Sequence, residues 1–245
     1  MIKLGISGAC GRMGKIIGKL AFEDTKNFKV EVALERKNHP LVGKNYAQIL
    51  GYDENVIITD SPEDIKNIDV LVEFSNPQAT LEHLEWCQKF KKKMVIGTTG
   101  FNSSQLKKIK KASSKIGILL SPNMSLGVNL LFKILEKVSG ILCKDYDVEI
   151  IDIHHRYKKD APSGTGKKFS QIISKYYKKE IPVHSLRIGE VFGDHYIIFS
   201  GNKERIEFIH KAVTREVFAQ GALKASIFIH RKQKGFYTMQ DLLKL

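Results

Sequence analysis

The chain has 245 residues, of which 42% are hydrophobic, enough to bury the core of one large domain or of two modest ones. No stretch approaches the ~20 consecutive apolar residues of a membrane-spanning helix, so no membrane partner is expected. The formal net charge of +14 suits acidic ligands or nucleic acid, but the lysine runs are scattered and lack interleaved arginines and aromatics, so no nucleic-acid partner is expected.

The cysteines and the first residues indicate the compartment. Cys10, Cys87 and Cys143 lie far apart and form no Cys-x-x-Cys pair. Neither a disulfide framework nor a cysteine zinc site is therefore expected, and we predict no metal. The opening MIKLGISGAC is too short and too broken by glycine for a signal peptide, and favours a strand. These features predict a protein of the reducing cytoplasm.

Strands and helices alternate over the first half of the chain. The run IKLGIS is apolar and ends at a glycine, as a buried parallel strand does. Ser61 and Asn76, each followed by proline, are expected to cap two helices. Strands are predicted at 2–7, 28–35, 56–59, 69–75, 93–100 and 116–121, and helices at 11–22, 60–67, 76–90 and 103–114. This alternation predicts an α/β fold with a Rossmann-like, doubly wound parallel sheet.

The pattern changes in the second half, where strands follow one another without intervening helices. SGNKE, at 200–204, is a hairpin turn signal. Helices are predicted at 130–142, 164–177 and 214–229, and strands at 146–155, 184–189, 194–201 and 205–212. We expect a smaller α+β substrate domain with an open mixed sheet. The dinucleotide-binding domain is predicted at 1–125, completed by 215–245, and the substrate-binding and catalytic domain at 126–214.

Three glycines stand between the first predicted strand and the first helix, in GISGACGRMG. Gly8, Gly11 and Gly14 are spaced G-x-x-G-x-x-G, with Cys10 where a glycine could stand. Glycines there let a backbone approach a pyrophosphate, which the helix N-terminus attracts. A tight strand–helix turn is the alternative, but the position directly after the first strand favours a nucleotide loop.

Charged residues at the end of the second strand bear on the choice of cofactor. An acid there, Glu35, bonds the adenosine ribose in dinucleotide folds and favours NADH. Arg36, helped by Arg12, could pair with a 2′-phosphate and favours NADPH. The alternative to a cofactor contact is that Glu35 and Arg36 form an exposed charge pair. Because both signals are present, use of both cofactors is expected.

Two further loops follow the fifth and sixth strands. GTTG, at 97–100, and SPNMS, at 121–125, lie at carboxyl ends of parallel strands, which line the cleft of such folds. A plain turn and a hinge between domains are the alternatives. Both loops are compatible with contact to the nicotinamide half of the cofactor.

The densest charge lies in HHRYKKDAPSGTG, residues 154–166. His154 ends a strand, and a histidine can move a proton near neutral pH. Lys158 is crowded by other cations, which makes a lysine a more usable acid. The N–H groups of residues 163–166, at the start of a helix, can hold a carboxylate. A solvated loop or a nucleic-acid contact is the alternative, but the combination suits a small dicarboxylate substrate better than a polymer.

The chain resembles the 4-hydroxy-tetrahydrodipicolinate reductase (dihydrodipicolinate reductase) family. GACGRMG, LER, VIGTTGF, HHRYKKDAPSGTG, ERIEFIHKA and GFYTMQDLL match in order over almost the whole chain. The resemblance implies an oxidoreductase of lysine and diaminopimelate biosynthesis that uses NADH or NADPH to reduce 4-hydroxy-tetrahydrodipicolinate to tetrahydrodipicolinate.

The resemblance also implies roles for individual residues. His154 is the proton donor and acceptor and Lys158 the proton donor, while His155, Gly164 and Thr165 bind substrate. The cofactor-binding residues implied are Gly8, Ala9, Cys10, Gly11, Arg12, Met13, Glu35, Arg36, Gly97, Thr98, Thr99, Ser121, Pro122, Asn123 and Met124.

The chain departs from the family pattern in two places. Tyr157 stands where many members have histidine. The segment 177–186 is short, whereas many relatives have a longer arm that helps to associate subunits. A homo-oligomer is expected, with the tetramer of the family left open. Another two-domain NAD(P)-dependent reductase, acting on a different dicarboxylate or a semialdehyde, is the alternative function.

Overall fold

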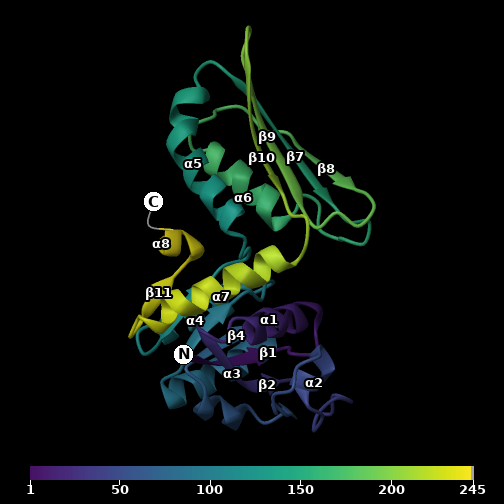
Figure 1. Cartoon of the computed structure of the whole chain (residues 1–245). Coiled ribbons are helices and arrows are strands. Elements are labelled where there is room, and N and C mark those ends of the chain that lie inside the picture. The colour runs from purple at the N-terminus through teal and green to yellow at the C-terminus, as the bar shows by residue number, and fades with distance from the viewer. Residues whose placement is uncertain (244–245) are drawn as a thin grey trace. The chain divides into compact units, whose positions relative to one another are not determined.

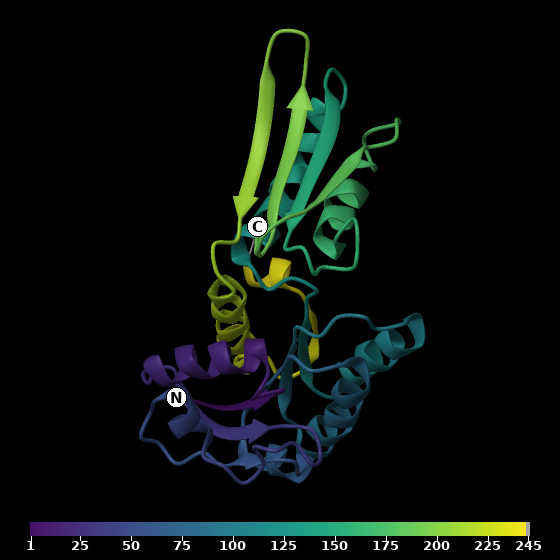
Figure 2. The same cartoon turned by 90° about the vertical axis from the view of Figure 1, so that its right-hand side faces the viewer.

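A computed structural model describes residues 1–243 of the chain (Figures 1 and 2). They form two compact units. The first contains Met1–Met124 and the segment from Phe218 onward, and the second contains Ser125–Val217. No helix among the described residues is long and apolar enough to cross a membrane.

The first unit is built on a seven-stranded sheet in the order β11-β6-β5-β4-β1-β2-β3. Every neighbouring pair in it is parallel. The four residues of β4 are all buried, as expected of a strand covered on both faces. The strands are β1 Ile2–Ser7, β2 Phe28–Leu34, β3 Ile58–Thr59, β4 Val70–Glu73, β5 Lys93–Ile96, β6 Gly117–Leu120 and β11 Gly235–Tyr237.

Helices cover both faces of this sheet. On one face, buried side chains of α3 and α4 such as Leu84, Cys87 and Ile109 share a core with the strand residues Leu71 and Met94. Helix α1 lies against the other face (Figure 2). The helices of this unit are α1 Arg12–Glu23, α2 Tyr46–Leu50, η1 Pro62–Asn67, α3 Pro77–Phe90, α4 Ser103–Ala112, α7 Glu216–His230 and α8 Met239–Leu243.

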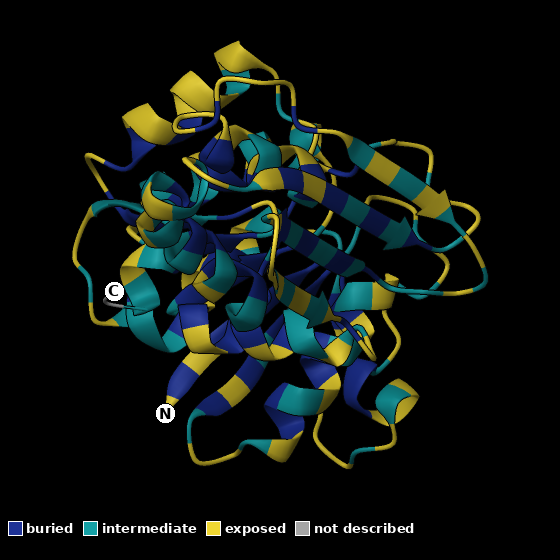
Figure 3. Cartoon of the chain, turned by 90° about the horizontal axis from the view of Figure 1, so that it is seen from above, coloured by how far each residue is buried: buried dark blue, intermediate teal, exposed yellow. Residues whose placement is uncertain are grey.

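The second unit has a four-stranded mixed sheet in the order β10-β9-β7-β8. Strands β7 and β8 are parallel, whereas β9 is antiparallel to both of its neighbours. Buried residues alternate with exposed or half-buried ones along β7, as in a sheet with one covered face. Figure 3 shows the burial of each residue over the chain. The elements are α5 Leu126–Leu142, β7 Asp147–His154, α6 Gly164–Ile173, β8 Val183–Arg187, β9 Asp194–Ser200 and β10 Arg205–Lys211.

Two helices cover the buried face of the second sheet. Phe132 of α5 and Phe169 of α6 have ring centroids 4.7 Å apart, and both belong to one core with Ile150, Ile197 and Phe199 of the strands. The fold class predicted from the sequence is therefore confirmed in both units.

Some predicted elements differ in detail. The segment after Ser61 is a 3-10 helix, and the Ser61 side chain makes no cap hydrogen bond, whereas Asn76 accepts from the N–H groups of Gln78 and Ala79 as expected. Helix α5 begins at Leu126, four residues earlier than predicted, because Ser125 caps it through the N–H of Val128. The sequence patterns did not predict α2, β11 or α8.

Candidate functional site

In the loop between β1 and α1, the backbone at two glycines lies very close to other backbone segments. Gly8 has a φ of +68°, and a Cβ there would lie 2.7 Å from the carbonyl oxygen of Phe74. A Cβ on Gly14 would lie 2.2 Å from the carbonyl oxygen of Gly8. Glycine is therefore needed at both positions. Gly11 is the N-cap of α1 and supplies no side-chain hydrogen bond, so no capping side chain competes with an anion for the first N–H groups of the helix.

The neighbouring residues of this loop have different exposures. Ala9 is buried and its N–H donates to the carbonyl of Leu34 at 3.2 Å. Arg12 is exposed as the first residue of α1, and Met13 is half-buried. Arg12 is thus an exposed cation at the start of the helix.

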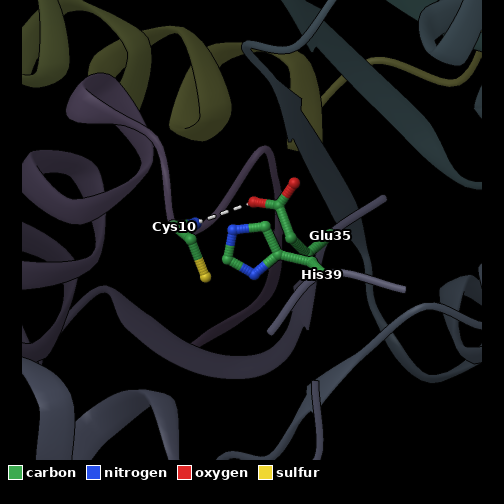
Figure 4. Close-up of side chains that lie close together, drawn as sticks. All are labelled: Cys10, Glu35 and His39. Carbon is green, nitrogen blue, oxygen red and sulfur yellow. Dashed lines mark hydrogen bonds between the residues drawn. The ribbon is translucent and has the colours of Figure 1, made fainter. Parts of the chain in front are cut away.

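Backbone N–H groups hold the carboxylate of Glu35, which follows β2 (Figure 4). Its Oε2 accepts from the N–H of Cys10 at 3.1 Å, and its Oε1 accepts from the N–H of Arg36 at 3.0 Å. Burial and the nearby Glu35 raise the pKa of Cys10 to about 11. The thiol is therefore protonated near neutral pH and is a poor nucleophile.

An open pocket of about 600 Å³ lies beside the glycine loop. Gly8, Gly11, Glu35 and Arg36 line it, together with residues of α3 and of the loops after β3 and β4. The structure therefore brings four of the predicted cofactor residues together around one space.

A buried pair that sequence reasoning missed stands at this pocket. His83 of α3 lines it, and its Nδ1 lies 2.6 Å from Oε2 of the fully buried Glu73 and 3.2 Å from Oγ of Ser7. Since Nδ1 faces Glu73, Nε2 is the ring nitrogen left to meet a ligand. His83 follows Glu73 by ten positions, across the end of β4 and the start of α3, so no local motif indicates the pair.

The remaining predicted cofactor residues stand at the ends of β5 and β6. Oγ1 of Thr98 accepts the N–H of Ser75 at 3.1 Å, which joins the loops after β4 and β5. A Cβ on Gly97 would overlap the ring of Phe74, and Thr99 is exposed. In the next loop, Oγ of Ser121 donates to the carbonyl of Asn123 at 2.7 Å, Pro122 is exposed and Met124 is buried.

In the second unit, His154 ends β7 and is held by the buried Asp152 two residues before it. Because alternate residues of a strand share a face, the two side chains lie together. Nδ1 of His154 lies 3.1 Å from Oδ1 of Asp152. At the other side of the ring, a Cβ on Gly193 would lie 3.1 Å from Nε2, so glycine at 193 keeps space beside this nitrogen.

Asp152 is fully buried and gathers several donors. It accepts from the N–H and the Oγ of Ser163 at 2.9 and 2.6 Å and from Arg187 at 3.2 Å, and Nε2 of His195 lies 3.3 Å from it. Burial would raise the pKa of this carboxyl, but the close ring nitrogens of His154 and His195 and the hydrogen bonds from Ser163 outweigh burial and hold the pKa well below its usual range. Asp152 is therefore an anion that positions His154.

Two further histidines, the buried His195 and the half-buried His210, continue from this cluster. The His195 ring lies 5.3 Å from that of His154 and 6.2 Å from that of His210, centroid to centroid. Nε2 of His210 lies 3.1 Å from Oγ of Ser125. Burial lowers the pKa of both His195 and His210, which favours their neutral forms.

The pH dependence of stability follows from these shifts. A histidine whose pKa is lowered in the folded protein stabilises the fold fully above its unfolded pKa of about 6.5, and this stabilisation is lost as the pH falls below that value. The lowered pKa of Asp152 likewise stabilises the fold above the unfolded pKa of about 4, and this stabilisation is lost at lower pH. We expect urea unfolding followed by circular dichroism to show a falling free energy of unfolding between about pH 7 and pH 5. His210→Gln should flatten this slope, and the exposed His184→Gln should not. An unchanged slope in His210→Gln would contradict the assignment.

Lys158 lies in the loop after β7 beside a carboxylate that the sequence argument left out. Its Nζ lies 2.8 Å from Oδ1 of Asp160, and its side chain is 24% exposed. The cations expected around Lys158 are therefore not its only charged neighbours, because the loop folds Asp160 back onto it. His155 is half-buried, with its ring 6.4 Å from that of the exposed Tyr157.

The start of α6 differs from the expected carboxylate cradle. Of the four expected N–H donors, that of Ser163 donates to Asp152, and that of Gly166 donates to Oγ of Ser163, the cap of the helix. Fewer N–H groups are therefore left to bind a carboxylate than the sequence predicts. A side chain at Gly164 would meet nothing within 4 Å, so the helix start is open at this residue.

Comparison with known proteins decides the family. The model of the family "Dihydrodipicolinate reductase, N-terminus" matches residues 2–124, and that of "Dihydrodipicolinate reductase, C-terminus" matches residues 127–243. The chain belongs to the dihydrodipicolinate reductase family. It is thus an NAD(P)-dependent oxidoreductase. It is 38% identical to the 4-hydroxy-tetrahydrodipicolinate reductase of Buchnera aphidicola subsp. Acyrthosiphon pisum (strain APS), over 99% of this chain and 98% of that one.

Further relatives agree. The reductase of Nitrosospira multiformis is 39% identical over 100% of this chain and 98% of its own. The solved structure "Dipicolinate bound Dihydrodipicolinate reductase from Paenisporosarcina sp. TG-14" has a TM-score of 0.78 and 25% identity, covering 97% of each chain. An amine dehydrogenase from Mycobacterium smegmatis, with a TM-score of 0.70 and 11% identity over 98% of this chain and 95% of that one, shares the fold alone.

Two clusters of possible metal ligands occur in this dihydrodipicolinate reductase family member. Among the described residues, Cys10, Glu35 and His39 form one, and Asp152, His154 and His195 form the other. Sequence reasoning found neither, since each joins separate loops or strands. The expectation that the chain has no metal stays a prediction.

Proposed function

We propose that the chain reduces 4-hydroxy-tetrahydrodipicolinate to tetrahydrodipicolinate, with NADH or NADPH, in lysine and diaminopimelate biosynthesis. The observation that supports this most strongly is the HHRYKKDAPSGTG loop, in which His154 on its buried carboxylate, Lys158 and the open start of α6 belong to one segment. The proposal predicts oxidation of reduced nicotinamide that depends on this substrate, followed by absorbance.

The first unit suits a nicotinamide dinucleotide. Gly8 and Gly14 leave backbone where a side chain would clash, the start of α1 has no capping side chain, and Glu35 offers a fixed carboxylate to ribose hydroxyls. We assign this unit as the dinucleotide-binding domain, with residues 8–13, 35–36, 97–99 and 121–124 as its contacts. When bound, the cofactor supplies a hydride.

The second unit suits the substrate and its proton. We assign Gly164 and Thr165, at the helix start, and His155 to the substrate carboxylates. Dipicolinate, the molecule named with the Paenisporosarcina structure, is a planar dicarboxylate of this class. Lys158 donates a proton toward the ring nitrogen, which becomes basic as hydride arrives, and His154 exchanges protons in the same step. Asp152 keeps His154 oriented.

We expect NADH and NADPH to differ by no more than about tenfold in kcat/KM, because opposed contacts of about 1 kcal/mol nearly cancel. Glu35 favours the free ribose of NADH, while Arg36 and Arg12 favour the phosphate of NADPH. Arg36→Ala should therefore lower kcat/KM for NADPH selectively in steady-state assays with each cofactor. Lys37→Ala, next to it at the same pocket, is the matched control. An equal loss for both cofactors would show that Arg36 does not contact the phosphate.

Three wider features remain part of this proposal. The proton donors are side chains, so the reaction needs no metal. The protein is expected to work in the cytoplasm, in line with its separated cysteines. A homo-oligomer is expected, and the short segment 177–186 leaves the tetramer of the family open.

A further inference from the structure

Cys10, Glu35 and His39 bring three different ligating groups together at the first unit (Figure 4). A thiol sulfur, a carboxylate oxygen and a ring nitrogen all lie within 4.8 Å of one another. They come from only two loops, which follow β1 and β2. All three residues are half-buried, so an ion could reach them from solvent.

Backbone hydrogen bonds already hold two of these side chains in place. The N–H groups of Cys10 and Arg36 fix the two oxygens of Glu35, each of which retains a second lone pair. The N–H of Leu41 donates to Nδ1 of His39 at 3.2 Å. Because Nδ1 accepts this hydrogen bond, the proton of the neutral ring is on Nε2. Ligation of an ion through Nε2 therefore moves the proton to Nδ1 and breaks the hydrogen bond from Leu41.

The donor set selects the kind of ion. One sulfur, one nitrogen and one oxygen are ligands that Zn²⁺ accepts in tetrahedral sites, with a fourth position left for water. The Cys10 thiol, which is protonated in the free protein, releases its proton to solvent when its sulfur binds the ion. Mg²⁺ and Ca²⁺ prefer oxygen ligands alone and do not favour a thiolate. The cluster therefore suits Zn²⁺, and Co²⁺ as its spectroscopic substitute.

We propose that Cys10, Glu35 and His39 form an inhibitory site for Zn²⁺, and that the bound ion competes with the cofactor. The competition rests on the proposed function, in which the Glu35 carboxylate accepts the ribose hydroxyls. A carboxylate that ligates Zn²⁺ no longer offers those lone pairs, and the ion stands where the ribose would approach. Zn²⁺ binding and cofactor binding therefore exclude each other.

The test titrates Zn²⁺ into the full-length enzyme during NADH oxidation, in a buffer that does not bind metal. We expect inhibition that is competitive with NADH. His39→Asn removes Nε2 while its Oδ1 can still accept the Leu41 N–H, so NADH kinetics should stay normal and the inhibition constant for Zn²⁺ should rise at least about tenfold. His184→Asn, at an exposed histidine beside Glu149 in the second unit, should leave the inhibition constant unchanged.

Co²⁺ binding supplies a second readout that needs no activity. One Co²⁺ per chain should give a thiolate charge-transfer band, which Cys10→Ser should abolish and Cys143→Ser should not. NADH should remove the band from the wild-type protein. Any of three results would overturn the proposal. These are inhibition that is not competitive with NADH, an inhibition constant for Zn²⁺ that is unchanged in His39→Asn, and a charge-transfer band that survives in Cys10→Ser. Absence of NADH oxidation with an intact Co²⁺ band would instead refute the proposed function while leaving the metal site standing.

Discussion

Replacing Lys158 by alanine is expected to lower kcat at least about a hundredfold, because removing a general acid typically costs 10²–10⁴-fold. His154→Ala should have an effect of similar size. NADH affinity should stay near normal in both variants, since both residues belong to the second unit. Steady-state kinetics with NADH, together with NADH binding followed by fluorescence, measure the two quantities separately.

Lys159→Ala is the matched control for this prediction. Lys159 is an exposed cation one residue away, so its loss should raise KM and leave kcat nearly unchanged. The double variant at His154 and Lys158 should cost much less than the product of the single effects, because the two residues serve one proton-transfer step. A near-normal kcat in Lys158→Ala, or a parallel loss of NADH binding, would refute the role of this loop.

The second large effect is expected at Asp152, which we assign as a positioning residue. Asp152→Asn should lower kcat about ten- to hundredfold, the usual cost of losing a partner that orients a reacting group. It should also reduce the free energy of unfolding by about 3–5 kcal/mol, because Arg187, whose side chain is 16% exposed, loses its buried counter-ion. Urea unfolding and steady-state kinetics check the two effects.

The pH profile separates positioning from a merely structural role. Because Nδ1 of His154 lies 3.1 Å from Asp152, replacing that anion with a neutral amide in Asp152→Asn should alter the pH dependence of kcat. Asp147→Asn, at the exposed start of the same strand, should change neither kcat nor the profile. A lower kcat with the wild-type profile would mean that Asp152 acts only through the stability of the fold.

The sequence predicts the parallel sheet well because its signals are local. Apolar runs that end at glycine or at a capped helix start give β1, β4 and β5 to within a few residues. Short elements are not predicted in this way, since the three residues of β11 are defined only by their pairing with β6. Likewise, Leu126 begins a helix because Ser125 caps it, a signal that the preceding SPN obscured.

The site is predictable where it follows the chain and not where it depends on tertiary contacts. His154 and Lys158 stand in one motif, whereas His195 reaches Asp152 only through the pairing of β7 with β9. The alternation of side chains along a strand could have indicated Asp152, since a residue two positions before His154 lies on the same face. The expected donors at Ser163 and Gly166 failed because these N–H groups are used within the protein.

The most direct test of the central claim is a coupled assay with purified enzyme. Pyruvate and aspartate semialdehyde are condensed in place to form 4-hydroxy-tetrahydrodipicolinate, and oxidation of NADH and of NADPH is followed by absorbance. We predict oxidation of both cofactors that requires both precursors and that falls at least about a hundredfold in Lys158→Ala. Oxidation that does not depend on the condensed substrate, or none with either cofactor, would contradict the account.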